Sequence, residues 1–456
     1  MDNFFGEDES KNTHQNTSNC AMNATMPPSN RDKKRKMRMA IIAVALAVVC
    51  FLAGACTVWF SLDKQMRTLA KVKRMIEQQY YKEVTDEEFY GAIFDAVNND
   101  VLDRYSQYMT ADEFVSSQAS MAGSRIGIGV SFSVKDQAGN AQMRIVSVSG
   151  NSPAEEAGLL AGMYLTGFGK TETEVVDSVD FEAFSAFLQP IEAGEQFVIK
   201  TEYAGTVQYF NVCKRAYVEN YVFYRTKDKS YTFTGAKANV LTERGKGLSC
   251  LDEQTAYVRL KQFSGTAAEN MKSALEQFKK DGKKNLVLDL RENGGGYLNT
   301  MQTIAGYFCK SAKGKKPLAA IADYGNRQEK FYADFNVYDD YFAEDSRICI
   351  LADGGTASAS ECLIGCMVDY NTVSYGDICL SERNGVTKTY GKGIMQTTFY
   401  VGVEKDALKL TTAEIRWPSG NSIHDRGVLP KDGTKTVADN VDDDMEIAAA
   451  IAALFS

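Results

Sequence analysis

The chain has 456 residues, of which 44% are hydrophobic and 24% charged, and its formal net charge at pH 7 is −8. These values are typical of a globular protein with two or three domains and a sizeable core. The acidic balance and the lack of a basic patch with interleaved aromatic residues argue against a nucleic-acid binder. His14 and His424 are the two histidines, which excludes a histidine-rich metal site, so we expect neither a metal nor a cofactor.

The N-terminal segment combines a polar tail, a basic cluster and an apolar run. Residues 1–37 are mostly polar and end in basic residues, which predicts a disordered cytoplasmic tail. Residues 39–60 carry no charge and can span a bilayer, so we predict a single-pass membrane anchor over 38–61. Because the basic cluster precedes the span, residues 62–456 are expected to lie outside the cell. A cleaved signal peptide is the alternative, although this run is longer than its usual apolar core.

The part of the chain after the predicted anchor has a net charge of −10 and contains seven of the ten cysteines. The charge indicates no preference for anionic surfaces. The number of cysteines is odd, and no pair has the CxxC spacing. Cys362 and Cys366 are four residues apart on a predicted helix, which is poor spacing for a disulfide. We interpret these cysteines mainly as buried small apolar residues, and a disulfide elsewhere stays open.

Residues 62–121 are expected to form a helical arm, because Leu69, Val72, Ile76 and Tyr80 recur at helical spacing. The next ninety or so residues change to strand signals with two short helices, which predicts a compact β-rich module. Its expected elements are strands at 125–132, 143–148, 196–201 and 207–212, a short helix after Pro153, and a helix at 181–188.

Two motifs in this module resemble a bacterial-type PDZ domain. They are "RIGIGVSF" (125–132) and "SPAEEAGLLAGMYL" (152–165). In that family the glycine loop and the strand after it hold a peptide's C-terminal carboxylate on backbone amides, and the peptide extends the sheet. The resemblance implies this role for Ile126, Gly127, Ile128 and Gly129. A small β-sandwich with tight turns is the alternative reading.

The last part of the chain alternates strands with helices, which predicts an α/β core with a parallel or mixed sheet. The expected helices include 267–280, with Met271, Leu275 and Phe278 on one face. The other expected elements are a strand at 254–263, a strand, glycine loop and helix within 284–308, a strand at 347–352, a helix at 361–370 and a short strand at 373–376.

"LADGGTASASE" (351–361) carries three hydroxyl residues, and a hydroxyl nucleophile needs a base. Where no histidine is available, the usual base is a lysine that burial keeps neutral. Lys392 lies between two glycines in "GKGIMQ" and precedes apolar residues, as a partly buried amine would. Gln396 is four residues on, so its amide lies on the same side and can orient the amine without charging it.

The order of these motifs resembles the carboxyl-terminal processing (tail-specific) serine peptidases, from about residue 70 to the end. The resemblance implies that Ser358 is the nucleophile, Lys392 the general base and Gln396 its orienting partner. Backbone amides of Gly295 or Gly296 and of Ala359 would form the oxyanion hole. Thr356 and Ser360 would flank the site, with Ser360 structural. Two departures from the family are Gly294 in place of a proline and a longer loop before Lys392, which makes Lys388 a rival base.

The sequence therefore predicts a membrane-anchored serine endopeptidase that holds protein C-termini on its PDZ module and cleaves through an acyl-enzyme. The PDZ module would also gate the site. The alternatives are a catalytically silent, membrane-anchored PDZ scaffold and a hydrolase that pairs Ser358 with His424. A homo-oligomer stays open. The predicted domains are a tail (1–37), an anchor (38–61), a helical arm (62–121), a PDZ-like domain (122–215) and a tail-specific peptidase domain (216–456).

Overall fold

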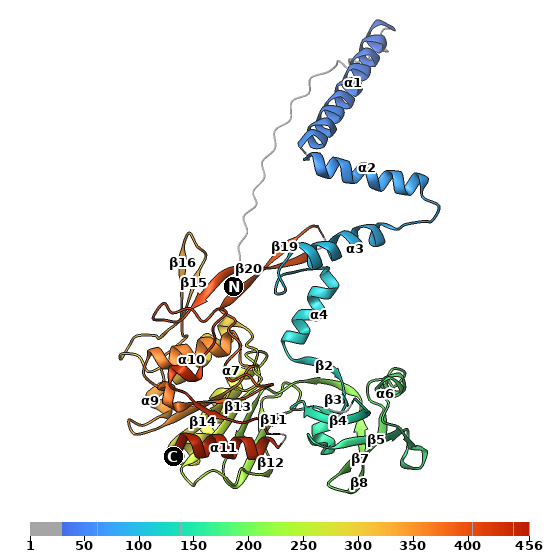
Figure 1. The fold of residues 1–456 in the computed structure, drawn as a ribbon. Helices are drawn as coiled ribbons and strands as arrows, with labels where there is room; N and C mark the ends of the chain where they lie inside the picture. Colours follow the sequence, from blue (N-terminus) through green and yellow to red (C-terminus); the bar gives the residue numbers. More distant parts are fainter. Residues whose placement is uncertain (1–29, 62, 137–138, 404, 441, 456) are drawn as a thin grey trace, which may run out of the picture. The chain divides into compact units, whose positions relative to one another are not determined.

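The computed structural model describes residues 30–61, 63–136, 139–403, 405–440 and 442–455 (Figure 1). Residues 1–29 of the tail predicted to be disordered lie outside these residues, whereas residues 30–37 of that tail form the start of a helix. Backbone contacts divide the chain into two units, one that ends at Ile93 and one that runs from Phe94 to the C-terminus. This division does not test the finer domain boundaries predicted above, which stay predictions.

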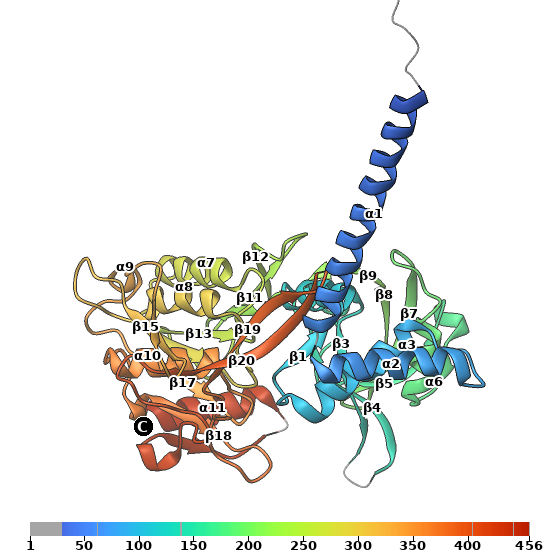
Figure 2. The same ribbon diagram turned by 90° about the horizontal axis from the view of Figure 1, so that it is seen from above.

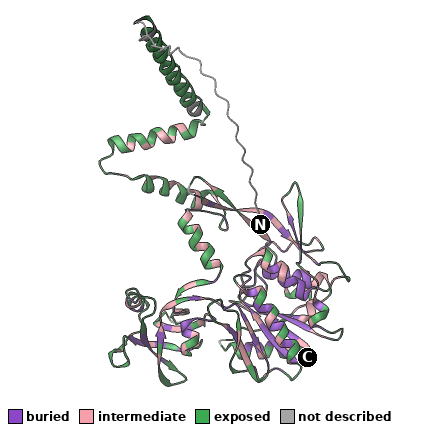
Figure 3. Cartoon of the chain, turned by 180° about the vertical axis from the view of Figure 1, so that it is seen from behind, coloured by how far each residue is buried: buried purple, intermediate pink, exposed green. Residues whose placement is uncertain are grey.

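The first unit contains α1 (Asn30–Ser61), α2 (Lys64–Gln79) and most of α3 (Asp86–Ala96). Within α1, Lys34–Thr57 is long and apolar enough to cross a membrane, and it overlaps the predicted anchor. Its described side chains are exposed, as Figure 3 shows. Its length and composition fit either a membrane anchor or a signal sequence.

The helices expected between residues 62 and 121 are confirmed, but two other elements interrupt them. A π-helical turn, Val97–Val101, continues α3, and the strand β1, Gln107–Met109, precedes α4, Ala111–Met121. Thr110 caps α4, because its hydroxyl accepts from the Glu113 amide while the Glu113 carboxylate accepts from the Thr110 amide.

A six-stranded sheet with its own hydrophobic core forms the β-rich module. The strand order is β3-β4-β5-β7-β8, with β6 paired to β5, so β3 is an edge strand. The helix expected at 181–188 is confirmed as α6. The elements are β2 (Ser124–Gly127), β3 (Val130–Lys135), β4 (Ala141–Val148), α5 (Pro153–Ala157), β5 (Tyr164–Gly169), η2 (Glu172–Glu174), β6 (Val176–Asp177), α6 (Phe181–Leu188), β7 (Gln196–Tyr203), β8 (Thr206–Cys213) and β9 (Arg215–Val218), which pairs with β2.

The following region is a mixed α/β fold around an eight-stranded sheet of order β12-β11-β10-β13-β14-β17-β18-β21. The strands from β13 to β21 in this order are parallel, and β10 to β12 are antiparallel. The elements are β10 (Val222–Arg225), β11 (Lys229–Thr234), β12 (Val240–Lys246), β13 (Thr255–Leu260), α7 (Ala267–Lys280), β14 (Asn285–Asp289), α8 (Leu298–Phe308), α9 (Tyr338–Tyr341), β17 (Ile348–Ala352), α10 (Ala359–Asp369), η3 (Tyr375–Asp377), β18 (Ile378–Ser381), η4 (Pro430–Asp432), β21 (Lys435–Val437) and α11 (Asp443–Phe455).

Helices cover both faces of this sheet (Figure 2). On one face α7, α8 and α10 share the main core, and the predicted apolar face of α7 is fully buried there. On the other face α11 packs against β18 and β21. The layers explain why β14 and β17 read as continuous apolar runs, because both faces of these central strands are buried.

A second sheet holds a hairpin that the sequence analysis did not predict. Its strands are β1, β15 (Leu318–Asp323), β16 (Gln328–Tyr332), β19 (Ile394–Val401) and β20 (Asp406–Arg416). Two predicted elements differ: the strand expected at 125–132 is divided into β2 and β3, which belong to different sheets, and residues 373–376 do not form a strand. Ser374 and Asp377 close a 3₁₀ turn through their side chains, and the strand begins at Ile378, where a fully buried run starts.

Candidate active site

Ser358 lies in the turn between the buried strand β17 and helix α10. Its backbone has φ +58° and ψ −116°, a conformation that residues with a side chain rarely adopt. The neighbouring residues Ala357 and Ala359 are buried, whereas Ser358 is partly exposed. Such strain at a strand-to-helix turn lifts one side chain out of the packed layer, as nucleophile turns of hydrolases do.

The two hydroxyls on either side of Ser358 are used to fix this turn. Thr356 Oγ1 donates to the Leu290 carbonyl and Ser360 Oγ donates to the Asn293 carbonyl, both at 2.8 Å, and both side chains are buried. These bonds attach the turn to the glycine loop that follows β14. Of the three hydroxyl residues in the motif, Ser358 is therefore the one that is partly exposed.

The glycine loop passes so close to Ser358 that a side chain has no room there. A Cβ atom on Gly295 would lie 2.8 Å from Ser358 Cβ and 2.9 Å from the Ala359 nitrogen, and φ at Gly295 is +102°. The Gly295 amide donates to Asn293 Oδ1 at 2.9 Å. The amides of Gly296 and Ala359 donate to no other group in the described part of the chain, so these two remain available to an oxyanion.

Lys392 and Gln396 come together as their spacing predicts. Lys392 Nζ donates to Gln396 Oε1 at 3.0 Å, and Gln396 Nε2 donates to Thr411 Oγ1 on the neighbouring strand β20. The amine also lies 4.6 Å from the centre of the Tyr105 ring. Burial lowers the pKa of Lys392, and the nearby positive charge of Lys409 lowers it further. A lysine in this setting is more easily neutral than one in water.

Glu361 links the serine turn to the lysine segment. Its carboxylate is fully buried and accepts four hydrogen bonds, two on each oxygen. One oxygen accepts from the Ser358 amide at 3.0 Å and the Lys392 amide at 2.9 Å. The other accepts from the Thr389 hydroxyl at 2.6 Å and the Gly391 amide at 2.8 Å. A single carboxylate therefore sets the position of the Ser358 backbone relative to the Lys392 backbone, although the two lie far apart in the sequence.

Lys388 and His424, the alternative bases, have surroundings that differ from those of Lys392. Lys388 is partly buried, and its amine makes no hydrogen bond or ion pair within the described residues. His424 Nε2 lies 3.7 Å from Asp425, and its ring does not hydrogen-bond to Ser358. Neither side chain has an orienting partner of the kind that Gln396 provides for Lys392.

A known protein family matches the region of the chain that contains these residues. Residues 254–432 match the family model described as peptidase family S41. The chain contains an S41 peptidase domain. This domain includes the glycine loop, Ser358, Lys392 and Gln396.

Similar whole chains are named serine proteases. The chain is 28% identical to a "Probable CtpA-like serine protease" of Staphylococcus haemolyticus, over 92% of this chain and 77% of that one. It is 27% identical to a protein of the same name from Staphylococcus saprophyticus, over 87% and 73% of the two chains. Among solved structures, a photosystem II D1 C-terminal processing protease matches with a TM-score of 0.44 and 21% identity, over 82% of this chain and 93% of that one.

Several residues around the candidate site were not found from the sequence. Tyr105 precedes β1 and covers the lysine amine, and its hydroxyl lies 3.3 Å from that of Tyr390. The buried Asp353 accepts from the Glu292 and Gly355 amides at 2.9 Å, which ties the serine turn to the glycine loop. No spacing rule connects Tyr105 with Lys392, since most of the second unit separates them in the sequence. The Glu at the end of "TASASE" was visible as a motif residue, but its partners were not.

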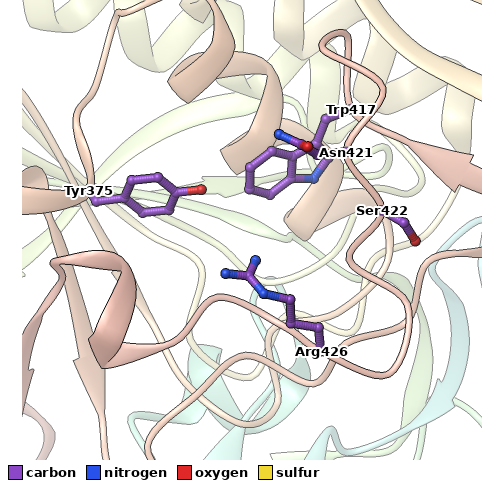
Figure 4. Close-up of a pocket in the computed structure, with 5 residues that line it drawn as sticks. All are labelled: Tyr375, Trp417, Asn421, Ser422 and Arg426. Carbon is purple, nitrogen blue, oxygen red and sulfur yellow. The ribbon is translucent and has the colours of Figure 1, made fainter.

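Two cavities lie on the second unit. One, of about 420 Å³, borders Tyr105 and Lys409 and is lined by Asp95, Asn98, Asn99, Asp103, Arg104, Tyr105, Ser106, Gln107 and Lys409. The other, of about 340 Å³, is shown in Figure 4 and is lined by Tyr375, Trp417, Asn421, Ser422 and Arg426. None of the predicted catalytic residues lines either cavity.

Of the residues predicted to hold a peptide carboxylate, Ile126 and Gly127 end β2, and Ile128 and Gly129 form the turn before β3. Gly127 and Gly129 have φ of +148° and +80°, and a Cβ on Gly129 would lie 2.3 Å from Ser152 Cβ. The amides of Ile128 and Gly129 donate to no other group in the described residues. The side chain of Ile128 is buried, whereas Ile126 is 76% exposed. On the edge strand β3, Phe132 packs against Phe184 of α6, with ring centres 5.7 Å apart.

Proposed function

We propose that this chain is a membrane-anchored serine endopeptidase that cleaves peptide bonds with Ser358 and Lys392. The observation that carries the proposal is the joint setting of the two residues. Ser358 lies on a strained turn against the glycine loop, Lys392 is a partly buried amine held by Gln396, and Glu361 accepts from both backbones.

In the proposed reaction, neutral Lys392 takes the proton of the Ser358 hydroxyl as Ser358 Oγ attacks the scissile carbonyl. The amides of Gly296 and Ala359 stabilise the oxyanion of the tetrahedral intermediate, and each such donor is worth about 3 kcal/mol of barrier. Protonated Lys392 then gives its proton to the leaving amine, and an acyl-enzyme remains. Water, deprotonated by Lys392, releases the acyl group and restores Ser358.

We further propose that the β-rich module is a PDZ domain that selects substrates by their C-terminal tails. The free amides of Ile128 and Gly129 suit a carboxylate, and β3 is a sheet edge to which a tail can add as a strand. The apolar helix α1 supports a single-pass anchor, with the N-terminus in the cytoplasm and the peptidase domain outside.

The proposal is tested with the full chain in detergent and a disordered protein substrate that ends in apolar residues. The wild type and a Lys388→Ala control are expected to cleave it. Ser358→Ala and Lys392→Ala should each lose at least about a thousandfold in kcat/KM, because the nucleophile and its base act as one unit. Both inactive variants should still bind the tail.

Unchanged cleavage by Ser358→Ala would disprove the mechanism. If the wild type binds tails but cleaves none, the chain is a binding scaffold rather than a peptidase.

A further inference from the structure

Two buried thiols contact each other in the main core that α8 and α10 share. The Sγ atoms of Cys309 and Cys366 are 2.8 Å apart, and both side chains are fully buried. We propose that these two residues form a disulfide when the chain folds in an oxidising compartment. No local pattern signals this pair, because the partners are distant in the sequence and Cys366 lies one helical turn from another cysteine, Cys362.

The neighbouring cysteines lack such a contact. Cys362 precedes Cys366 by one turn of α10, and its sulfur contacts no other sulfur within hydrogen-bonding distance in the described residues. Cys349 and Cys379 lie on adjacent strands and belong to the core on the opposite face of the sheet. The pairing is thus specific to Cys309 and Cys366, which belong to the core beneath α8 and α10.

Each cysteine of the pair lies on or at the end of a helix that follows a segment of the candidate active site. Helix α8 starts two residues after Gly296 and ends with Cys309 as its C-cap. Helix α10 starts directly after Ser358, and Cys366 lies two turns further on. The proposed bond therefore joins the two helices whose N-terminal ends follow the glycine loop and the nucleophile. It would fix their relative position at the end away from the chemistry.

The chemistry needs a disulfide-containing oxidant, such as oxidised glutathione or a protein disulfide. The two thiols lose two protons and two electrons to form the S–S bond, and the oxidant leaves as two thiols. Burial raises the pKa of the Cys309 thiol, so the reactive thiolate is scarce once the domain is folded. The exchange must therefore occur during folding. This route rests on the proposed outward location, because cytosolic thiols are kept reduced.

The test is thiol mapping of the full chain extracted from membranes in detergent, with iodoacetamide present from cell lysis. A second sample is unfolded in urea and refolded in detergent with a mixture of reduced and oxidised glutathione. We expect peptides containing Cys309 and Cys366 to be linked in both samples and released by reductant. Reduction should also lower the thermal midpoint of the second unit by about 5–10 °C.

Cys362→Ala is the matched control, since it removes a buried thiol from the same helix. This variant should keep the link and the response to reductant, whereas Cys366→Ala should lose both. Alkylation of both cysteines in both samples of the wild type would overturn the proposal. A link in the refolded sample alone would support the pairing and contradict the outward location. None of these measurements depends on peptidase activity.

Discussion

The chain has two glycine-rich turns with opposite characters. Around Ser358 the side chains are fixed by hydrogen bonds: Thr356 and Ser360 donate to carbonyls of the glycine loop, and Glu361 accepts four hydrogen bonds, while the amides of Gly296 and Ala359 stay open among the described residues. In the turn between β2 and β3, the amides of Ile128 and Gly129 have no partner among the described residues.

The difference shows what each turn can do. A reaction gains most from groups that are already held in the geometry of the transition state, so side chains that fix the backbone suit Ser358. A loop that captures a carboxylate needs open backbone donors, and the turn between β2 and β3 offers them. Glycine serves both turns for the same steric reason, because at each turn a Cβ would collide with a neighbouring backbone or side chain. Adding a Cβ to one turn and then to the other therefore tests the contrast.

The largest effect is expected for Gly295→Ala. The added Cβ would meet Ser358 Cβ at 2.8 Å and the Ala359 nitrogen at 2.9 Å, so the glycine loop must move away from the nucleophile. We expect kcat to fall about 100- to 1,000-fold, with tail binding unchanged. Gly294→Ala is the matched control, because no atom lies within 4 Å of its Cβ position. Steady-state kinetics on a tailed protein substrate measure both variants, and equal losses would show that the contact with Ser358 is irrelevant.

A smaller effect is expected for Gly129→Ala in the carboxylate loop. Its Cβ would lie 2.3 Å from Ser152 Cβ, which displaces the loop whose amides are open. Tail binding, measured by fluorescence anisotropy, should weaken about tenfold, an amount equal to about 1.4 kcal/mol. Cleavage of a short peptide without a tail should not change. Gly205→Ala shares the positive φ of +75° but meets no atom within 4 Å, so it should bind tails normally. If the Gly129→Ala variant binds tails as tightly as the wild type, this loop does not take part in tail recognition.

The smallest effect is expected in the pH dependence of kcat/KM. It shows whether the charge of Lys409 or its packing affects Lys392. Lys392 must be neutral to act as a base, so kcat/KM should rise with pH through its pKa and be lost below it. Burial lowers that pKa first, and Lys409 and Arg104 lower it further, while Asp103 raises it. Lys409→Gln removes one positive charge, so the pKa of Lys392 should rise and the acidic limb should move to higher pH. Lys409→Arg keeps the charge and should leave the limb in place. If the acidic limb of the pH profile moves equally in both variants, a change in packing and not the lost charge causes the shift.

Periodicity and buried runs predicted most of the elements near the site. Helices α6 and α7 begin and end as expected, because amphipathic spacing needs only local information. The strand expected at 373–376 was wrong, because side-chain bonds within Ser374–Asp377 favour a turn over a strand. The hairpin β19–β20 was missed, although it carries Gln396. The residues of β19 are partly buried or exposed and show no clear alternation.

The sequence by itself determined which residue types are available for chemistry. It supplied small residues around Ser358, a lysine between glycines, an amide four residues on and an apolar N-terminal run, and these are local patterns. Only the tertiary structure decided how they meet. The bonds to Glu361 from the lysine segment, the Tyr105 ring over the Lys392 amine and the contact of Cys309 with Cys366 join segments that are distant in the sequence. Such contacts follow from how the sheets and helices pack, and no local spacing encodes them.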